Sequence, residues 1–363
     1  MAIEHLYLQG VRNLAPTTIT PSPQINQIHG LNGSGKTSLL EAIYYLAYAR
    51  SFRTHKHQNL IQSEQDLFTL FCKLGSSHEG GSHQLGIERN RSGERRIKLN
   101  GEWLKSAAEL AGMLPVQLLD PGMFTLLEGS PQYRREYLDW GVFHVEQQFL
   151  NTWRDFKLAH KTRNALLKRE QVSELETTIW HDKLASLAEA ITIMRIEYIQ
   201  ALKPYFDHYM ALLSPDIEVS LTFNQGWVKG RPYREVLDES WDTDRKQGFT
   251  QVGPQRADLR LRSGNALAVE KLSRGQQKMV VCALKLAQAK MYQDTTGCRS
   301  IFLVDDLGAE LDINHRKALC GLLEDLKCQV FVTVVEEGQM AQCWSTDVQL
   351  TKFHVEHGTI NQE

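Results

Sequence analysis

The sequence has no long apolar run, no excess of charge of either sign and no pair of cysteines at a metal-binding spacing. No apolar run approaches the roughly 20 residues that a membrane-spanning helix needs. The 41 Lys and Arg residues nearly balance the 43 Asp and Glu residues, so the formal net charge is −2. Because there is no overall basic field, any contact with nucleic acid must come from local patches.

The six cysteines show no C-x-x-C pair, which favours buried, reduced thiols in a cytosolic protein over a disulfide framework or a metal site. The first residues, MAIEHLYLQGVRNL, alternate apolar and polar side chains and include Glu4. This pattern predicts an edge strand and not a signal peptide. We therefore expect a cytoplasmic protein without a membrane segment. Its 363 residues are enough for one large domain or two lobes.

Residues 30–37, GLNGSGKT, match the G-x-x-x-x-G-K-[ST] pattern of phosphate-binding loops. The glycines allow backbone angles that a side chain would forbid, so successive N–H groups can surround a phosphate chain at the N-terminus of the following helix. We expect Lys36 to neutralise the β and γ phosphates and the Thr37 hydroxyl to hold Mg²⁺. The alternative is a glycine-rich turn that only happens to precede a helix. The predicted nucleotide-binding residues of the loop are Gly30, Leu31, Asn32, Gly33, Ser34, Gly35, Lys36, Thr37 and Ser38.

Residues 301–306, IFLVDD, place two carboxylates after four apolar residues. The apolar run suits a strand buried on both faces, and open α/β sheets bind ligands at the carboxyl ends of such strands. We expect Asp305 to contact Mg²⁺, directly or through water, and Asp306 to orient or deprotonate an attacking water. The alternative is a buried strand that ends in a solvated acidic turn. A phosphate loop in the same chain favours the functional interpretation, since the two motifs are parts of one mechanism.

Residues 272–278, LSRGQQK, precede a stretch with the apolar periodicity of a helix. Ser273 and Gln276 have the spacing of a capping box, in which each residue satisfies a backbone N–H of the other. Helix capping explains this pair without any function. The additional features are Leu272, Gly275 and a position ahead of the two aspartates.

The apolar periodicity along the chain predicts an α/β protein. In its last third, alternating helices and strands indicate parallel strands with crossover helices. Before that, residues 68–104 read as an antiparallel meander with a tight turn at Asn100, and the region 106–215 reads as mostly helical. The expected elements are strands at 3–8 and 17–28, a helix at 38–50, a helix starting at the capping pair 130–131, two antiparallel helices of modest length within 145–205 with a break at 168–178, strand-like segments around a looser stretch at 224–248, a helix at 274–292, a strand at 300–305, a helix at 312–326 and a strand at 328–334.

Two of these segments resemble the ATP-binding-cassette (ABC) ATPases. LSRGQ at 272–276 is similar to their LSGGQ signature, and GAELD at 308–312 resembles their D-loop. In that family two heads sandwich two ATP molecules, so the resemblance implies a homodimer that forms on ATP. The signature of one subunit then meets the γ-phosphate held by the partner's phosphate loop, which suits the attraction of a helix N-terminus for anions. The implied catalytic residues are Asp306, Lys36 and Ser273, and the implied signature contacts to the nucleotide are Ser273, Gly275 and Gln276.

Further segments resemble the RecF family of bacterial DNA-repair ATPases, and together they cover essentially the whole chain. They are GLNGSGKTSLLEAI at 30–43, RSFR at 50–53, GSPQYRREYLD at 129–139, KTRNALLK at 161–168, GPQRADL at 253–259 and LSRGQQK at 272–278.

The resemblance to RecF implies a cytoplasmic, ATP-dependent DNA-binding protein with ATP and Mg²⁺ as cofactors. Such a protein dimerises on ATP, recognises single-stranded, gapped or junction DNA, and works with RecR and RecO to place RecA on single strands. Roles in replication restart and the SOS response, and a weak DNA-stimulated ATPase activity, follow from the same resemblance.

Four positions depart from the ABC pattern. The residue after the Mg²⁺ aspartate is Asp306 where most ABC ATPases have Glu, which implies slow hydrolysis. Ala309 stands where a D-loop serine is usual. No Q-loop glutamine is evident, since Asp120 lies near the expected place, and Thr333 follows the last core strand where a switch histidine is expected. These departures concern turnover more than ATP binding.

Contacts to DNA have no sequence signature of their own, because phosphate contacts need only placed cations. Long cations are normal on solvated surfaces, so each basic cluster also has that simpler interpretation. The candidate clusters are Arg50, Arg53 and Lys56; Arg89, Arg91, Arg95 and Arg96 on a predicted hairpin; and Lys157, Lys161, Arg163, Lys168 and Arg169 along a predicted helix.

We therefore expect a P-loop NTPase of the ABC/SMC head type with two lobes, an antiparallel β-meander and a helical insertion. Lobe I comprises residues 1–119 and 250–363, and helical lobe II comprises residues 120–249, with the signature segment 270–292 packed against lobe II. The alternatives are the ATPase subunit of a membrane transporter, another SMC-like DNA-organising ATPase, and a small-molecule kinase with a phosphate loop. A transporter subunit would lack the insertion at 145–205, and a kinase would have no reason to carry LSRGQ.

Overall fold

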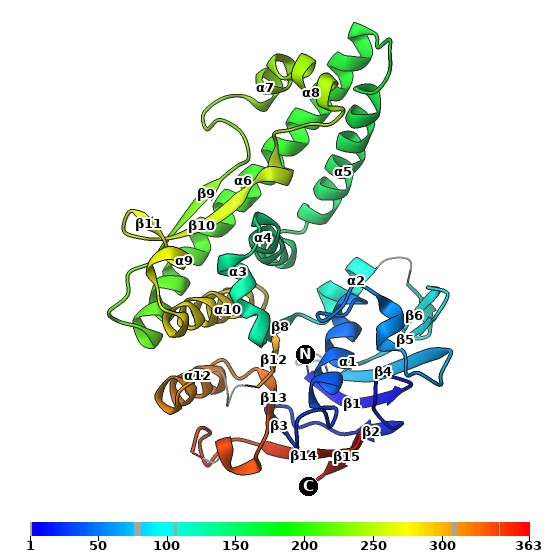
Figure 1. Cartoon of the computed structure of the whole chain (residues 1–363), viewed down its shortest axis with the longest axis vertical. Coiled ribbons are helices and arrows are strands. Elements are labelled where there is room, and N and C mark those ends of the chain that lie inside the picture. The colour runs from blue at the N-terminus through cyan, green and yellow to red at the C-terminus, as the bar shows by residue number, and fades with distance from the viewer. Residues whose placement is uncertain (1, 76–80, 105–106, 307–310, 341) are drawn as a thin grey trace. The chain divides into compact units, whose positions relative to one another are not determined.

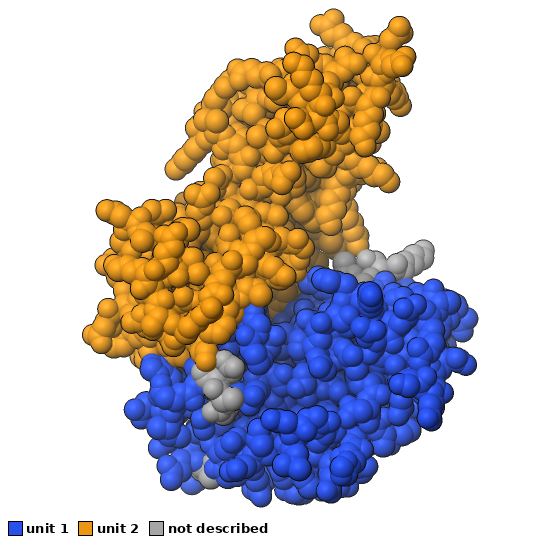
Figure 2. All heavy atoms as spheres, viewed as in Figure 1, with its two compact units in different colours: residues 1–123, 282–363 blue, residues 124–281 orange. Residues whose placement is uncertain are grey.

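The structure is a computed structural model that describes residues 2–75, 81–104, 107–306, 311–340 and 342–363. The chain divides into two compact units, residues 1–123 with 282–363 (unit 1) and residues 124–281 (unit 2), which are coloured separately in Figure 2. None of the described helices combines the length and the apolar character that crossing a bilayer requires.

A six-stranded sheet runs through unit 1 (Figure 1), in the order β15-β14-β3-β13-β12-β8. Every neighbouring pair from β14 to β8 is parallel, which confirms the expected parallel strands, and β15 adds an antiparallel edge. The last two strands and β8 were not expected, because β8 falls in a region whose pattern looked helical. The strands are β3 Ile25–His29, β8 Val116–Leu119, β12 Ile301–Val304, β13 Gln329–Val334, β14 Leu350–Glu356 and β15 Thr359–Gln362.

The central strand β3 is fully buried although its sequence, INQIH, is half polar. Asn26 donates through Nδ2 to the carbonyl oxygens of Ser22 at 2.9 Å and Val330 at 3.3 Å. Gln27 donates through Nε2 to the carbonyl oxygen of Glu337 at 2.9 Å. Since buried polar groups are tolerated when they are hydrogen-bonded, these side chains fasten the chain on both sides of β3 and do not disrupt the sheet.

A second, antiparallel sheet in unit 1 has the order β2-β1-β4-β5-β6-β7. The expected meander is confirmed, and its tight turn has positive φ at both Asn100 (49°) and Gly101 (88°), as a type I′ hairpin requires. The single strand expected at 17–28 is wrong: prolines at 21 and 23 divide it, and its halves pair in different sheets. The strands are β1 Ala2–Gln9, β2 Thr17–Ile19, β4 Leu67–Gly75, β5 Ser82–Asn90, β6 Arg95–Leu99 and β7 Glu102–Trp103.

Helix α1 (Lys36–Tyr48) joins the two sheets of unit 1 into one hydrophobic core. Its buried apolar residues include Leu39, Ile43 and Leu46, and the ring of Tyr45 meets the ring of Phe68 edge-on at 4.9 Å between centroids. This packing fixes the direction of α1, whose first turn carries the phosphate-loop lysine and threonine. The remaining helices of unit 1 include α2 Ala107–Met113 and α12 Ile313–Asp325.

Unit 2 contains a long helical hairpin and a small sheet in the order β11-β10-β9. The two expected helices and their break are confirmed, but the second was expected to be modest and has 40 residues. Ser130 precedes α4 as expected, yet its side chain makes no capping hydrogen bond, and the looser segment at 224–248 contains two short helices. The elements are α3 Thr125–Glu128, α4 Pro131–Val145, α5 Phe149–Leu166, α6 Glu174–Leu213, β9 Ser220–Asn224, α7 Tyr233–Glu239, α8 Trp241–Gln247, β10 Asp258–Ser263, β11 Ala266–Leu267 and α9 Ala268–Lys271.

The boundary between the units differs from the expected lobes, which changed at residues 120 and 250. Unit 2 extends to residue 281 because β10 forms a five-residue antiparallel register with β9, from Asp258–Asn224 to Arg262–Ser220. A strand cannot leave the sheet in which its ladder is satisfied without exposing its backbone. Helix α10 (Arg274–Thr296) begins in unit 2 and ends in unit 1.

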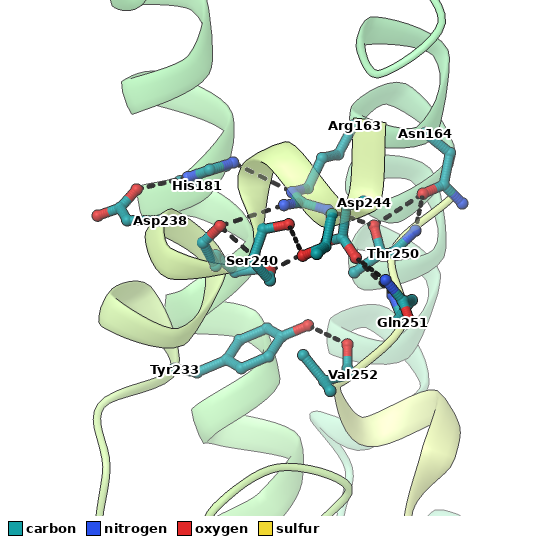
Figure 3. Close-up of polar contacts among 12 residues, drawn as sticks. Arg163, Asn164, His181, Tyr233, Asp238, Ser240, Asp244, Thr250, Gln251 and Val252 are labelled. Atoms are coloured by element: carbon teal, nitrogen blue, oxygen red, sulfur yellow. Dashed lines mark hydrogen bonds and ion pairs between the residues drawn. The ribbon is translucent and has the colours of Figure 1, made fainter. Parts of the chain in front are cut away.

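A buried polar network holds the hairpin of unit 2 to its short helices (Figure 3). Arg163 on α5 is fully buried and donates to Asp244 Oδ2 at 2.8 Å and to Thr250 Oγ1 at 2.7 Å. Its Nε donates to His181 Nε2 at 3.1 Å, while His181 Nδ1 lies 2.8 Å from Asp238 Oδ1. Burial lowers the pKa of His181, which keeps the ring neutral and its Nε2 free to accept. Arg163 is therefore not available to DNA, contrary to its place among the candidate cations.

We predict that Arg163→Met destabilises unit 2 by about 3–5 kcal/mol, because it leaves the carboxylate of Asp244 buried and unpaired. Chemical denaturation followed by tryptophan fluorescence measures the change. The matched control is Lys161→Met on the exposed face of the same helix, for which we expect a change within about 0.5 kcal/mol. Equal stability of the two variants would show that the network contributes nothing.

Candidate nucleotide-binding site

The phosphate loop connects the carboxyl end of β3 to the N-terminus of α1, and two of its glycines are required by the fold. Gly30 has φ 143°, and a Cβ added there would lie 2.2 Å from the carbonyl oxygen of Val355. Gly35 has φ 125°, and a Cβ there would lie 2.7 Å from Leu14 Cδ2. These positions give the loop the left-handed turns and the close backbone approach that the motif predicted.

Lys36 is buried at the first position of α1. Its Nζ donates to the carbonyl oxygens of Gly30 at 2.6 Å and Leu31 at 3.0 Å, so the ammonium lies inside the curve of the loop. Burial lowers the pKa of Lys36, and the charges of Asp306 and Asp305 oppose that effect. A desolvated cation in this position gains from an anion placed in the loop.

The two sequence motifs meet at Asp305, although 268 residues separate it from Thr37. Thr37 Oγ1 donates to Asp305 Oδ1 at 3.0 Å, and Thr333 Oγ1 donates to the same oxygen at 2.7 Å. Thr333 also accepts the backbone N–H of Asp306 at 2.8 Å, which holds Asp306 in the left-handed region at φ 54°. The sequence analysis placed Thr333 after the last core strand, but it lies within β13.

The two carboxylates are held close enough to influence each other. Burial raises the pKa of Asp305, and the charge of Asp306 raises it further, while hydrogen bonds from Thr333 and Thr37 lower it. Oxygen ligands of this type, a hydroxyl beside a carboxylate, suit Mg²⁺. The residues present therefore fit a divalent cation at Thr37 and Asp305.

Sequence reasoning missed a pair of arginines at the edge of the loop. Arg12 donates through Nε and Nη2 to both carboxylate oxygens of Glu41, at 2.9 and 2.8 Å. Arg53 Nη1 lies 3.6 Å from the same buried carboxylate. Arg53 had been grouped with possible DNA contacts, but it lines the pocket of the phosphate loop. Only the fold reveals the position of Arg53, because Arg12 and Arg53 come from separate segments and both lie next to the carboxylate of Glu41 on α1.

Asn13 braces the loop from outside. Its Nδ2 lies 3.2 Å from the carbonyl oxygens of both Gly33 and Ser34, and its Oδ1 accepts from Ser38 Oγ at 3.0 Å. Ser34 Oγ is buried without a hydrogen-bond partner among the described residues. A ligand oxygen in the loop would satisfy it.

These side chains surround a pocket of about 500 Å³ within unit 1. The pocket combines three cations with two carboxylates and the backbone of the loop, an arrangement suited to a polyphosphate with a metal ion. Leu31, in contrast, is exposed. The lining residues are Arg12, Asn13, Asn32, Gly33, Gly35, Lys36, Thr37, Ser38, Arg53, Asn59, Ile61, Ser63, Asp305, Asp306 and Thr333.

The signature segment lies in unit 2, at the N-terminus of α10. Ser273 N donates to Gln276 Oε1 at 2.9 Å and Gln276 N donates to Ser273 Oγ at 3.4 Å, which confirms the capping box. Ser273, Gly275 and Gln276 are exposed, and a Cβ on Gly275 would meet open space. Arg274 forms an ion pair with Glu128 within unit 2. The helix tip is therefore preformed and faces solvent.

Two other departures from the ABC pattern can be located. Asp120 follows β8, and burial raises the pKa of its carboxyl, while the charge of Lys285 lowers it. Burial lowers the pKa of Lys285 to about 8, with Asp120 opposing. Two partly buried ionisable side chains that influence each other, Asp120 and Lys285, thus occupy the region where a Q-loop glutamine was sought. Ala309 lies outside the described residues, as does most of the D-loop.

A parallel sheet with a phosphate loop, a facing pair of aspartates and a preformed signature helix defines a P-loop head of the ABC/SMC type. The family model described as "RecF/RecN/SMC N terminal domain" matches residues 2–361. The DNA replication and repair protein RecF of Pseudomonas syringae pv. tomato is 46% identical over 362 residues, covering 100% of this chain and 98% of that protein. RecF of Stutzerimonas stutzeri is 47% identical over 364 residues, with the same coverage. The chain belongs to the RecF family.

Solved structures agree with this assignment. The structure of the recombination mediator protein RecF-ATP in the RecFOR pathway has a TM-score of 0.88 and 26% identity, covering 100% of this chain and 97% of that one. An SMC head bound to the C-terminal winged-helix domain of ScpA has a TM-score of 0.60 at 16% identity, which shows a shared fold. The expected fold class is confirmed.

We predict that Thr333→Val, a replacement of nearly equal shape, destabilises unit 1 by about 1–3 kcal/mol, because it removes a donor to the buried Asp305 and the acceptor for the Asp306 amide. Denaturant unfolding measures the loss. Thr351→Val is the control, on strand β14 of the same sheet, on the other side of β3 from β13. The Thr351 side chain is partly buried and forms no hydrogen bond with a described residue, so this change is expected to have little effect. If Thr333→Val loses no more stability than the control, the hydrogen bonds of Thr333 to Asp305 and Asp306 do not stabilise unit 1.

Proposed function

We propose that this protein is an ATP-dependent DNA-binding protein of recombinational repair and replication restart. The observation that carries the proposal is the pocket in which Lys36, Thr37 and Asp305 converge from distant parts of the chain. The RecF relatives are named DNA replication and repair proteins, and a structural neighbour is described with ATP. The protein is proposed to act in the cytoplasm.

In the proposed reaction, the loop amides and Lys36 bind the phosphates of ATP, and Thr37 and Asp305 hold Mg²⁺. The metal, when bound, neutralises the charge that develops on the phosphates. Asp306 orients or deprotonates the attacking water. Its carboxylate is one methylene shorter than the glutamate of most ABC ATPases, which supports slow hydrolysis to ADP and phosphate. Stimulation of this weak activity by DNA is part of the proposal.

Dimerisation on ATP completes the proposed site. Ser273, Gly275 and Gln276 of one subunit meet the γ-phosphate held by the phosphate loop of the other. The exposed, preformed tip of α10 supports this role, because the N-terminus of a helix attracts anions. ATP then acts as a clamp between two subunits on single-stranded, gapped or junction DNA, and hydrolysis releases it. RecR and RecO are the proposed partners in loading RecA during the SOS response.

We predict that ATP with Mg²⁺ converts the wild-type protein from monomer to dimer, and that Ser273→Arg stays monomeric while still binding ATP. The large arginine side chain would fill the space in which the γ-phosphate bound by the partner subunit is proposed to lie. Sedimentation velocity with and without ATP measures the shift, and binding of a fluorescent ATP analogue verifies nucleotide affinity.

The matched controls for this experiment are Lys271→Arg, an exposed change just before the signature, and Lys36→Ala. The first is expected to dimerise normally. The second is expected to lose both nucleotide binding and dimerisation, because the buried cation of the loop is removed. A wild-type protein that remains monomeric with ATP would refute the clamp.

We predict that Asp306→Asn keeps ATP affinity and the ATP-dependent dimer but lowers turnover about 10²–10⁴-fold, the usual contribution of a general base. Phosphate release over hours and sedimentation are measured on the same sample. Loss of nucleotide binding in this variant would contradict the assigned role, and unchanged turnover would assign the water-activating group elsewhere.

A further inference from the structure

Two segments of unit 2, residues 129–139 and 253–259, contain several charged residues, none of which lines the nucleotide pocket. Part of this charge is structural. Arg134 Nε donates to Asp258 Oδ1 at 2.7 Å, and Arg195 donates to both oxygens of Asp139, at 2.8 and 3.0 Å. These ion pairs join α4 to β10 and to α6, and they engage the carboxylates of Asp139 and Asp258. The third carboxylate of the two segments, Glu136, is exposed and accepts a hydrogen bond from Gln132 Nε2 at 3.0 Å.

Arg135 is left without a carboxylate of its own. It is partly buried, and its Nη1 donates to the carbonyl oxygen of Ala257 at 2.8 Å, which fixes the direction of the side chain. Burial lowers the pKa of Arg135, and the neighbouring cations Arg195 and Arg256 lower it further. The carboxylates of Asp139 and Asp258, which are paired with other arginines, raise it. The fold thus holds a cation in place beside other cations, at an electrostatic cost.

Arg256 and Lys157 extend this cluster onto the surface of unit 2. Both side chains are exposed, and among the described residues no carboxylate forms an ion pair with Arg135, Lys157 or Arg256. The Nζ of Lys157 lies 5.4 Å from the ring centroid of Trp153, and the guanidinium carbon of Arg195 lies 5.1 Å from the same centroid. Burial raises the pKa of Asp139, and the charges of Arg195, Arg135 and Lys157 oppose that rise, so Lys157 lies near the ion pair of Arg195 and Asp139.

We propose that Arg135, Lys157 and Arg256 form a binding surface for the phosphate backbone of DNA. The inference rests on the proposed DNA-binding function and assigns residues to it. Three neighbouring cations that form no ion pair of their own with a described residue are stabilised by a chain of phosphates, and such contacts position nucleic acid without reading its sequence. The backbone carbonyl that orients Arg135 sets its guanidinium before any ligand arrives, which lowers the entropy lost on binding.

The test measures the salt dependence of binding to a fluorescein-labelled duplex that carries a single-stranded gap, in the presence of ATP and Mg²⁺. For each lost phosphate contact in duplex DNA, the slope of log K against log salt is expected to become shallower by about 0.9 per contacting subunit. We expect Lys157→Gln and Arg256→Gln each to show this change, and the double variant about twice the change.

Two further variants separate charge from structure. Arg135→Gln is expected to lose a similar part of the slope, whereas Arg135→Lys keeps the charge and is expected to keep the slope. Lys246→Gln is the matched control, because Lys246 is an exposed cation of α8 in the same unit. All variants are expected to keep wild-type affinity for a fluorescent ATP analogue and a wild-type unfolding midpoint.

The outcomes are distinct. If wild type binds the gapped duplex and the Lys157 and Arg256 variants keep its slope, this surface is not a DNA site; an acidic protein as the true occupant would give that same result. If wild type itself does not bind DNA with ATP, the proposed DNA-binding function fails, and this inference fails with it. A shallower slope confined to the cluster, with Lys246→Gln unchanged, supports the inference.

Discussion

The two hydrogen bonds that Asp305 accepts, from Thr37 on α1 and Thr333 on β13, fix the arrangement of the proposed nucleotide site. They connect the phosphate loop to the strand that carries the aspartates, across the parallel sheet. Burial raises the pKa of Asp305 and so disfavours the ionised carboxylate, and the two hydroxyl groups offset part of that effect. Because Thr333 also accepts the amide of Asp306, a single hydroxyl sets both acidic positions. The geometry of the proposed site therefore depends on the sheet and on α1 together, and not on a loop alone.

Unit 2 relies on a different use of charge. Arg163, Arg134 and Arg195 each lie in an ion pair with an aspartate from a distant segment, and additional hydrogen bonds to carbonyl or hydroxyl oxygens satisfy their guanidinium groups. Such pairs are worth little as net stability but are costly to break, so they specify one arrangement of helices. Cations that resemble one another in the sequence thus divide into structural ones and exposed ones. This division explains how a protein with a net charge of −2 can present a basic surface.

Much of the architecture could be predicted from local patterns. The phosphate loop, the parallel strands of the last third, the meander and the capping box at Ser273 follow from backbone requirements and from hydrophobic periodicity, which act over a few residues. The pattern failed where burial is decided at a distance. The residues of β3 were expected to form the end of one strand over 17–28, and only the fold shows that they belong to a separate sheet, where Asn26 and Gln27 are buried with hydrogen-bond partners. β8 reads as helical because its four residues are too few to show a period.

The sequence by itself determined the loop, the two carboxylates and the signature as separate motifs, because each needs particular residues at fixed short spacing. Only the tertiary structure decided that Arg53 belongs to the nucleotide pocket, that Arg163 is buried, and that Arg135 lies among cations without a carboxylate of its own. The physical reason is that an arginine looks the same in any sequence, whereas its role depends on which carboxylates and carbonyls the fold brings within hydrogen-bonding distance.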